Sequence, residues 1–232
     1  MLKITSLSKS YGTLPVLSDI SIAMGKEEIV AIVGPSGCGK TTLLNIIAGL
    51  EKPDSGDVEL GRSQVGYVFQ EDRLFPWLTL EENIRIVGEK GNDREIAELV
   101  TLVGLSGFEK YRPADLSGGM RQRCSLARAY NYHCDLLLMD EPFKSLDYAL
   151  RMEMLEGLMN IWRRRRNAVL LVTHEIDDAL SVASRILVLG KRPAGVIDAF
   201  ELGVTETPRH LDTGEYDAIR NAIIRQLTTR GK

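Results

Sequence analysis

The apolar residues of this chain fall into short continuous runs that alternate with longer stretches of helical periodicity. Residues 28–33, 136–139 and 169–173 are almost entirely apolar, which is typical of strands covered on both faces. Residues 41–50 and 94–103 place their apolar side chains on one stripe, as helices packed on a sheet do. This alternation predicts an α/β fold with a mainly parallel sheet that is covered by helices on both faces.

The remaining hydrophobic pattern predicts shorter elements and an overall division of the chain. Further strands are expected at residues 20–23, 58–60, 65–69 and 186–189, and further helices at 81–87, from Ser117 onward and at 216–227. The region of about residues 80–130 is helical in pattern. We therefore expect one main domain over residues 1–200, with a helical subdomain at about 80–130, followed by a short helical tail at 201–232.

Composition and charge narrow the class of protein. The chain has 232 residues, of which 44% are hydrophobic and 26% are charged, the balance of a soluble globular protein. A formal net charge of −3 gives no general attraction to nucleic acid, so no nucleic-acid partner is expected. No apolar stretch approaches the roughly 20 residues that cross a bilayer, and the first residues lack the apolar run of a secretory signal. We therefore expect a cytoplasmic chain.

A glycine-rich segment lies between the strand predicted at 28–33 and the helix predicted at 41–50. It matches the phosphate-loop pattern G-x-x-x-x-G-K-[ST] with Gly34, Pro35, Ser36, Gly37, Cys38, Gly39, Lys40 and Thr41. The glycines let backbone N–H groups curl around phosphate oxygens, and the following helix points its positive end at them. We expect Lys40 to neutralise the β- and γ-phosphates and Thr41 to ligate Mg²⁺. The flanking strand and helix disfavour the alternative, a glycine-rich turn that binds nothing.

Two acids, Asp140 and Glu141, follow the apolar run at residues 136–139. Ligands of open α/β sheets bind at the carboxyl ends of the strands. Asp140 is therefore expected to hold Mg²⁺, and Glu141 to act as the base that polarises the attacking water. An apolar strand that ends in two acids is a weak signal alone, but its position after a complete phosphate loop strengthens it.

The segment Leu116-Ser117-Gly118-Gly119-Met120 resembles the signature motif of ABC (ATP-binding cassette) transporter ATPases, with Met120 where the family most often has glutamine. Ser117 is a good N-cap, and Gly118 and Gly119 expose N–H groups, so this helix start suits an anion. The resemblance implies that the anion is the γ-phosphate of an ATP held by the other protomer. An ordinary capped helix start is the alternative. GTPases carry an Asn-Lys-x-Asp guanine-binding motif that this sequence lacks.

Other residues match the family in the expected order, and the resemblance covers about residues 1–200. Tyr11 matches the aromatic residue that stacks on adenine, and the implied nucleotide-binding set includes Thr42. Gln70 matches the glutamine that touches Mg²⁺ and the water. The less favoured alternative for Tyr11 is a turn residue packed on its own domain.

Two more matches concern the dimer and the γ-phosphate. Ser145-Leu146-Asp147 resembles the loop that communicates across the dimer, with Asp147 as the matching acid. His174 matches the switch histidine that contacts the γ-phosphate, although a lone histidine is more often structural.

The resemblance implies a fold and a mechanism. The fold is a P-loop NTPase core with a mainly parallel sheet, an antiparallel β subdomain and a helical signature subdomain. Two copies form a head-to-tail dimer that holds two ATPs, each between the phosphate loop of one copy and residues 117–119 of the other. Water attacks the γ-phosphorus in line, stabilised by Lys40, Mg²⁺, His174 and the partner's helix end. ATP closes the dimer and hydrolysis opens it.

Finer similarity concerns the type of transporter. Residues 70–79, 116–123 and 141–147 look like the nitrate/sulfonate/taurine branch of bacterial importers, although Lys144 departs from that branch's usual glycine. This implies two membrane-spanning permease subunits and, indirectly, a solute-binding protein as partners. It also implies a peripheral position on the inner face of the cell membrane. The transported solute stays open among nitrate, alkanesulfonates, taurine and heterocyclic vitamin precursors.

Two surface features each have two interpretations. The Phe75-Pro76-Trp77-Leu78 cluster beside Gln70 is costly to leave in water. It forms part of a groove for the permease's coupling helix, or else a small internal core under the loop. The four arginines at 163–166 contact anionic lipid or nucleic acid, or else complement a helix dipole, and we favour the helix dipole.

Two other functions are weighed against the importer. A soluble ABC ATPase for protein assembly, DNA repair or translation needs no membrane partner, but this chain has neither a second cassette nor a long coiled coil. A non-catalytic, nucleotide-gated module is disfavoured because Glu141 and His174 match the active pattern. Co-purification with two hydrophobic multi-spanning proteins separates the importer from the soluble ATPase.

Overall fold

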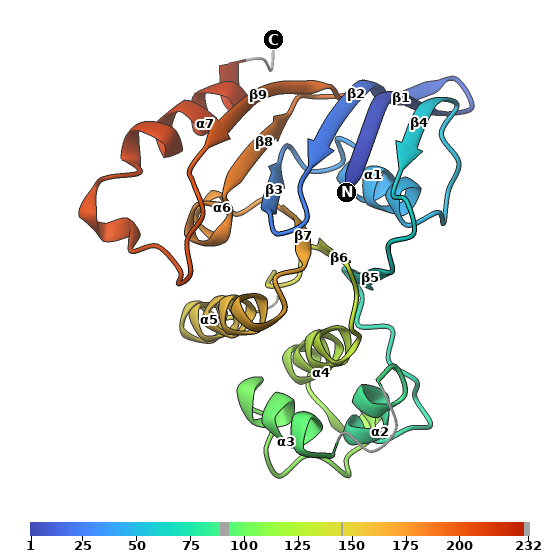
Figure 1. Ribbon diagram of the computed structural model, residues 1–232, viewed down its shortest axis with the longest axis vertical. Helices are drawn as coiled ribbons and strands as arrows, with labels where there is room; N and C mark the ends of the chain where they lie inside the picture. Colours follow the sequence, from blue (N-terminus) through green and yellow to red (C-terminus); the bar gives the residue numbers. More distant parts are fainter. Residues whose placement is uncertain (89–92, 145, 230–232) are drawn as a thin grey trace.

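The computed structural model describes residues 1–88, 93–144 and 146–229 (Figure 1). Ser145, which was expected in the dimer-contact loop, lies outside these residues. Within them the strands form a six-stranded sheet and a three-stranded sheet, and one group of helices extends away from both sheets.

The larger sheet orders its strands as β5, β6, β7, β3, β8 and β9. Their bounds are β5 Val65–Val68, β6 Leu136–Asp140, β7 Ala168–Thr173, β3 Ile29–Val33, β8 Arg185–Leu189 and β9 Val196–Glu201. All neighbours are parallel except β8 and β9, so the expected mainly parallel sheet is confirmed. Edge strand β9 was not predicted, because its partly exposed sequence contains two acids and lacks a continuous apolar run.

The helices cover the larger sheet and also form a separate group. Their bounds are α1 Lys40–Ile47, α2 Leu80–Arg85, α3 Asp93–Leu102, α4 Gly118–Asn131, α5 Tyr148–Arg165, α6 Ile176–Val182 and α7 Asp217–Thr229. In Figure 1, α2, α3 and α4 lie together below the sheets. Helix α7 contacts α6, β8 and β9 and buries Ile223. Among the described residues, no helix combines the length and apolar character needed to span a membrane.

The smaller sheet is antiparallel, with the order β2, β1 and β4. Its strands are β1 Leu2–Tyr11, β2 Leu14–Met24 and β4 Ser55–Glu59. The hydrophobic pattern predicted only parts of β2 and β4 and missed β1. Register shifts interrupt the pairing of β1 with both neighbours, so its buried residues do not alternate regularly.

Residues of the central strands face the two sides of the sheet in turn. Val30 and Ile32 of β3 belong to a buried cluster with α1 and the smaller sheet. Ala31 and Val33 belong to a second cluster with α4, α5 and α6. Every residue of β3, β6 and β7 is buried, which explains why these strands were visible as continuous apolar runs.

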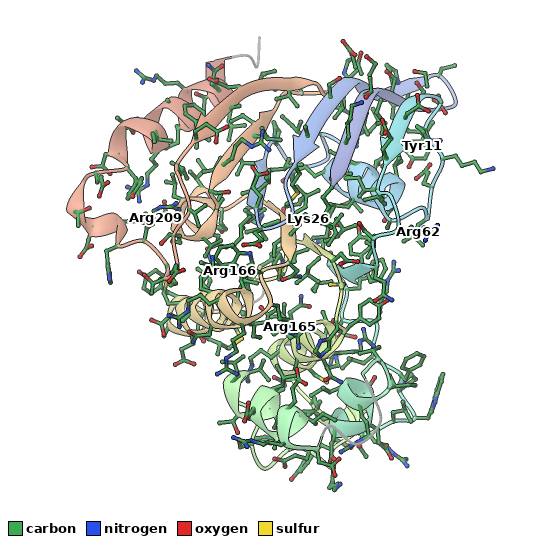
Figure 2. All side chains as sticks on the ribbon, in the orientation of Figure 1. Tyr11, Lys26, Arg62, Arg165, Arg166 and Arg209 are labelled. Atoms are coloured by element: carbon green, nitrogen blue, oxygen red, sulfur yellow. The ribbon has the colours of Figure 1, made fainter. Side chains whose placement is uncertain are left out.

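The arginine run ends α5, as predicted. Arg163, Arg164 and Arg165 occupy its last turn, and Arg166 follows in the left-handed conformation. The Arg166 guanidinium lies 4.6 Å from the centroid of the buried Trp162 ring. Figure 2 shows Arg165 and Arg166 at this helix end, where they pair with Glu95 and Glu206 respectively. The contacts support the structural interpretation of this run over a lipid or nucleic-acid site.

The loop between β5 and α2 is anchored at two points. Buried Asn83 accepts a hydrogen bond from the Phe75 N–H at 2.8 Å and donates to the Phe75 carbonyl oxygen at 3.1 Å. Arg121 Nε of α4 donates to Asp72 Oδ2 at 2.9 Å. Arg128 of α4 donates to the carbonyl oxygens of Asp72 and residue 73 at 3.1 and 2.9 Å. The first part of this loop is therefore bound to α4.

Candidate nucleotide site

The phosphate loop connects β3 to α1 at the carboxyl edge of the parallel strands. Gly39 is the N-cap of α1 and has a φ of 120°, a conformation that favours glycine. A Cβ at Gly39 would lie 2.8 Å from side-chain atoms of Val16 and Leu17. Only glycine therefore fits where β2 packs against the loop.

Lys40 lies along the inside of this loop. Its side chain is buried, and Nζ donates to the carbonyl oxygens of Gly34 at 2.9 Å and Pro35 at 3.0 Å. No acid occupies the first turn of α1. A buried ammonium group and the positive end of a helix attract an anion to the same place.

Thr41 and Asp140 meet beside Lys40. Thr41 Oγ1 donates to Asp140 Oδ2 at 2.7 Å, and Asp140 is 1% exposed. Burial raises the pKa of Asp140, and the hydrogen bond from Thr41 offsets part of this effect. Its Oδ1 is buried and has no hydrogen-bond partner among the described residues. A hydroxyl beside an incompletely satisfied carboxylate fits Mg²⁺, which prefers such oxygen ligands.

Glu141 and His174 are in direct contact. Glu141 Oε2 pairs with His174 Nδ1, and the two side chains are 11% and 37% exposed. Glu141 has a φ of 49°, a conformation that costs a non-glycine residue energy and is common at functional sites. Its backbone N–H donates to the carbonyl oxygen of Val172 at 2.9 Å, which fixes this conformation against β7.

Gln70 and Tyr11 approach the site from other strands. Val68 of β5 pairs with Met139 of β6 in parallel register, so Gln70 and Glu141 leave the sheet at the same edge. The side chain of Gln70 is exposed. Tyr11 ends β1 and is 47% exposed. Figure 2 shows it near β4.

The Tyr11 hydroxyl donates to Glu51, just after α1. Burial and this hydrogen bond raise the pKa of Tyr11, whereas a hydrogen bond with Thr42 lowers it. These contacts place the ring beside α1 and the phosphate loop, and the exposed fraction leaves it accessible to a ligand.

The signature segment forms the predicted capped helix start. Ser117 is the N-cap of α4 and accepts a hydrogen bond from the Met120 N–H at 3.3 Å. Ser117 and Gly118 are exposed, and Gly119 is half-buried. In Figure 1, α4 lies among the lower helices, apart from α1. A single copy of the chain therefore does not bring residues 117–119 to its own phosphate loop.

Asp147 also begins a helix. Its Oδ1 accepts a hydrogen bond from the Leu150 N–H at 3.0 Å and caps α5. The residue is exposed, so the cap leaves room for an additional contact.

The sequence profile of the ABC transporter family matches residues 17–144, more than half of the chain. The chain belongs to the ABC transporter family. Aliphatic sulfonates import ATP-binding protein SsuB 2 of Pseudomonas syringae pv. tomato is 45% identical over 202 residues, which cover 87% of this chain and 87% of that protein. Aliphatic sulfonates import ATP-binding protein SsuB of Bacillus subtilis (strain 168) is 38% identical over 222 residues, covering 91% and 87%.

Solved structures of ABC cassettes have the same fold. The dimeric post-hydrolysis state of the ATP-binding cassette MJ0796, bound to ADP and Pi, has a TM-score of 0.79 and 28% identity. The similarity covers 88% of this chain and 100% of that chain. The predicted fold class and family are thus confirmed, and this ABC subunit is an ATP-binding ATPase.

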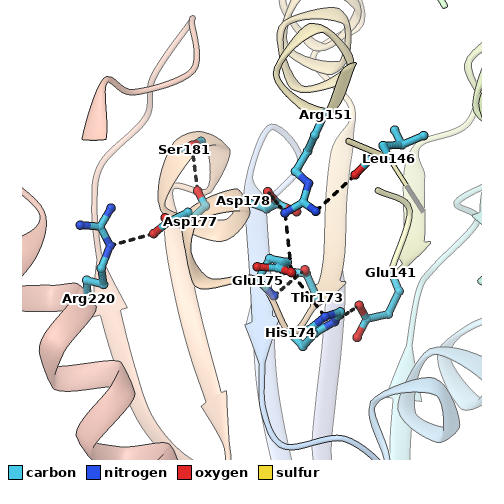
Figure 3. Close-up of polar contacts among 10 residues, drawn as sticks. All are labelled: Glu141, Leu146, Arg151, Thr173, His174, Glu175, Asp177, Asp178, Ser181 and Arg220. Carbon is cyan, nitrogen blue, oxygen red and sulfur yellow. Dashed lines mark hydrogen bonds and ion pairs between the residues drawn. The ribbon is translucent and has the colours of Figure 1, made fainter. Parts of the chain in front are cut away.

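The sequence motifs did not reveal a polar cluster next to His174, between α5 and the start of α6 (Figure 3). Arg151 of α5 lies 3.6 Å from Glu175 and 3.9 Å from Asp178, and Glu175 lies 3.5 Å from His174. Contacts between distant segments leave no local pattern.

A second group missed by the motifs lies on the other side of the phosphate loop. Lys191 and Arg192 follow β8, which pairs with β3 in parallel. The segment after β8 and the phosphate loop after β3 therefore leave the sheet at the same edge. With Pro35, Ser36, Gly37 and Cys38 they line an open pocket of about 390 Å³. The two cations add positive charge to this ABC ATPase beside its phosphate loop.

Asp178 gives the ABC subunit a testable pH dependence. Burial raises its pKa from 3.8 to about 6, although Arg151 lowers it in part. Between these values the folded chain holds the Asp178 proton more tightly than the unfolded chain, so this group's contribution to stability falls as pH rises. Asp178→Asn cannot ionise. We therefore expect its melting temperature to rise relative to the parent's between pH 4 and pH 7, measured by circular dichroism.

The matched control for this measurement is Asp177→Asn, which removes a carboxylate of the same helix whose side chain is 62% exposed. If the difference in melting temperature between Asp178→Asn and the parent stayed constant across this pH range, burial would not raise the pKa of Asp178.

Proposed function

We propose that this chain is the ATP-hydrolysing subunit that powers an importer of aliphatic sulfonates or similar small solutes. The observation that carries the proposal is the meeting of Thr41, Asp140, Glu141 and His174 at the end of the phosphate loop. Relatives named as sulfonate-import ATP-binding proteins cover most of the chain and support the transport role. The site is at the strand ends where ligands of such sheets bind.

ATP occupies the loop of residues 34–42, with its adenine stacked on Tyr11. Lys40 leaves the loop carbonyls to pair with the β- and γ-phosphates, because charged phosphate oxygens are stronger acceptors. Thr41, Asp140 and Gln70 would hold Mg²⁺, which would neutralise phosphate charge. The Asp140 Oδ1 atom, for which the described part of the chain supplies no hydrogen-bond partner, supports this assignment.

Hydrolysis depends on Glu141 and His174. Glu141 orients the water and accepts its proton as the oxygen attacks the γ-phosphorus in line. His174 donates a hydrogen bond to the γ-phosphate, where charge develops. Their direct contact supports these roles, because both side chains reach one space where the γ-phosphate and the water would lie in the complex.

A head-to-tail dimer completes the site. Ser117, Gly118 and Gly119 offer a helix start to an anion but lie apart from the phosphate loop of their own chain. A second copy supplies them across the γ-phosphate, and Asp147 contacts the partner at the same interface. Dimeric structures of the cassette MJ0796 support this arrangement.

The base assignment predicts the behaviour of Glu141→Gln. Without a proton acceptor, the rate of phosphate release should fall by at least about 100-fold. ATP binding should persist, and the variant should dimerise with Mg-ATP in light scattering because the bridging nucleotide is not consumed. Glu156→Gln, an exposed change on α5, is the matched control and should hydrolyse ATP like the parent. Equal turnover of Glu141→Gln and the parent would remove Glu141 from the mechanism.

Permease subunits dock beside the loop between β5 and α2. Phe75 is 37% and Trp77 is 66% exposed, and their ring centroids are 5.4 Å apart. This exposure argues against an internal core under the loop. Exposed aromatic residues are frequent anchors of interfaces, so a helix of the permease is the fitting occupant. This contact holds the subunit at the inner face of the membrane.

This docking predicts the effect of Trp77→Asp. Co-purification with the two permease subunits should fall at least about tenfold, because a charge would replace an apolar anchor. ATP hydrolysis by the isolated chain should not change. Leu50→Asp, at a site that is 61% exposed after α1, should keep the complex. A chain that never co-purifies with membrane proteins would favour a soluble ABC ATPase.

The solute class is tested in the reconstituted complex. We expect the solute-binding protein loaded with an alkanesulfonate to stimulate ATP hydrolysis at least about threefold over the empty binding protein. The reason is that transport couples docking of the loaded binding protein to ATP hydrolysis. Nitrate, taurine and a heterocyclic vitamin precursor serve as competing solutes. Stimulation by one of these without any response to alkanesulfonates would assign the importer to another solute of the branch.

A further inference from the structure

Arg151 lies between the loop that bears Asp147 and the loop that bears His174. Asp147 caps α5, and the Arg151 N–H donates to the Asp147 carbonyl oxygen at 2.9 Å. The two residues therefore share the first turn of one helix. Because a hydrogen-bonded helical turn is stiff, a displacement of Asp147 moves the Arg151 backbone with it.

The Arg151 side chain points from this turn toward α6 (Figure 3). Nη2 donates to the Leu146 carbonyl oxygen at 3.5 Å, and Nη1 lies 3.6 Å from Glu175 Oε1 and 3.9 Å from Asp178 Oδ1. The side chain is only 20% exposed, and that of Asp178 only 5%. One guanidinium thus joins the segment before α5 to the start of α6.

The contacts continue to the predicted catalytic pair. Glu175 Oε1, which faces Arg151, also lies 3.5 Å from His174 Nε2. The other ring nitrogen of His174 contacts Glu141. A continuous series of polar contacts therefore leads from Leu146 through Arg151, Glu175 and His174 to Glu141.

Burial and contact distances determine how firmly Arg151 is held in this series. A buried carboxylate is costly without a cation, so Asp178 holds the guanidinium in place. The pKa of Asp178 is raised to about 6 by burial even with Arg151 nearby. The contacts of Arg151 are longer than the roughly 2.7–2.9 Å of tight charge-assisted hydrogen bonds. They can shorten when the first turn of α5 moves.

We propose that Arg151 is a positioning residue that transmits movement of residues 146–147, caused by contact with a second copy of the chain, to His174 and Glu141. The inference rests on the proposed dimeric ATPase. It assigns to Arg151 a role in the hydrolysis step and none in holding ATP, because its contacts lead to the side chains that act on water and γ-phosphate.

The test compares kinetics of Arg151→Gln and the parent in the purified full-length chain. We expect kcat for ATP to fall about tenfold, with KM changed by less than about twofold. Arg151→Lys keeps the charge near Glu175 and should recover part of kcat. Arg220→Gln is the matched control, because Arg220 pairs at 2.7 Å with Asp177 of α6 but does not contact the series. It should stay within about twofold of the parent.

A double-mutant cycle with Glu175→Gln tests the connection itself. If both residues act through one series of contacts, the double variant should be no slower than the slower single variant. The proposal is overturned if the kcat reductions of the two single variants multiply in the double variant. It is also overturned if Arg151→Gln has the kcat of the parent or of Arg220→Gln, or if Arg151→Gln raises KM and leaves kcat unchanged. If Arg151→Gln does not fold, the cycle is run with Arg151→Lys.

Failure of the inference and failure of the proposed function give different results. Hydrolysis by the parent and ATP-dependent dimerisation of Glu141→Gln are measured first. An inactive, monomeric parent contradicts the proposed function, whereas an active parent with an unaffected Arg151→Gln contradicts only the role of Arg151.

Discussion

The parallel pairing of β3, β6 and β7 is the constraint on which the site depends. These strands end at one edge, so Gly34, Asp140 and His174 lie at that edge although they are far apart in the chain. All three strands are buried on both faces, and a shift of one residue in register would turn every side chain to the opposite face. Hydrophobic packing therefore fixes the positions from which the polar chemistry starts.

Much of this site could be predicted from the sequence because the information is local. An apolar run, a glycine-rich loop and a helix stripe indicate the phosphate loop, and the edge rule for parallel strands places Asp140 beside Thr41. Their 2.7 Å hydrogen bond confirms that the two residues meet. The N-cap at Ser117 could be predicted as well, because serine alone has a strong preference for the N-cap position of a helix.

The features that escaped prediction depend on long-range contacts or irregular pairing. Strand β1 contains register shifts that hide its periodicity, and β9 is a partly exposed edge strand. The contacts of Arg151 with α6 arise only when separate segments pack together. The exposure of Trp77 likewise could not be predicted from composition, because the same aromatic sequence is compatible with a surface cluster and with a small core.

The two arginines of α4 that hold the start of the loop between β5 and α2 have a mechanical consequence. Arg121 and Arg128 bind Asp72 and the neighbouring backbone, while Trp77 is exposed further along the same loop. Because Arg121 and Arg128 bind this loop start to α4, a displacement of Trp77 that reaches Asp72 also reaches α4, whose first residues include Gly118 and Gly119. The exposed aromatic residues of the loop and the helix start at Ser117 are therefore attached to the same helix, at separate points on its surface.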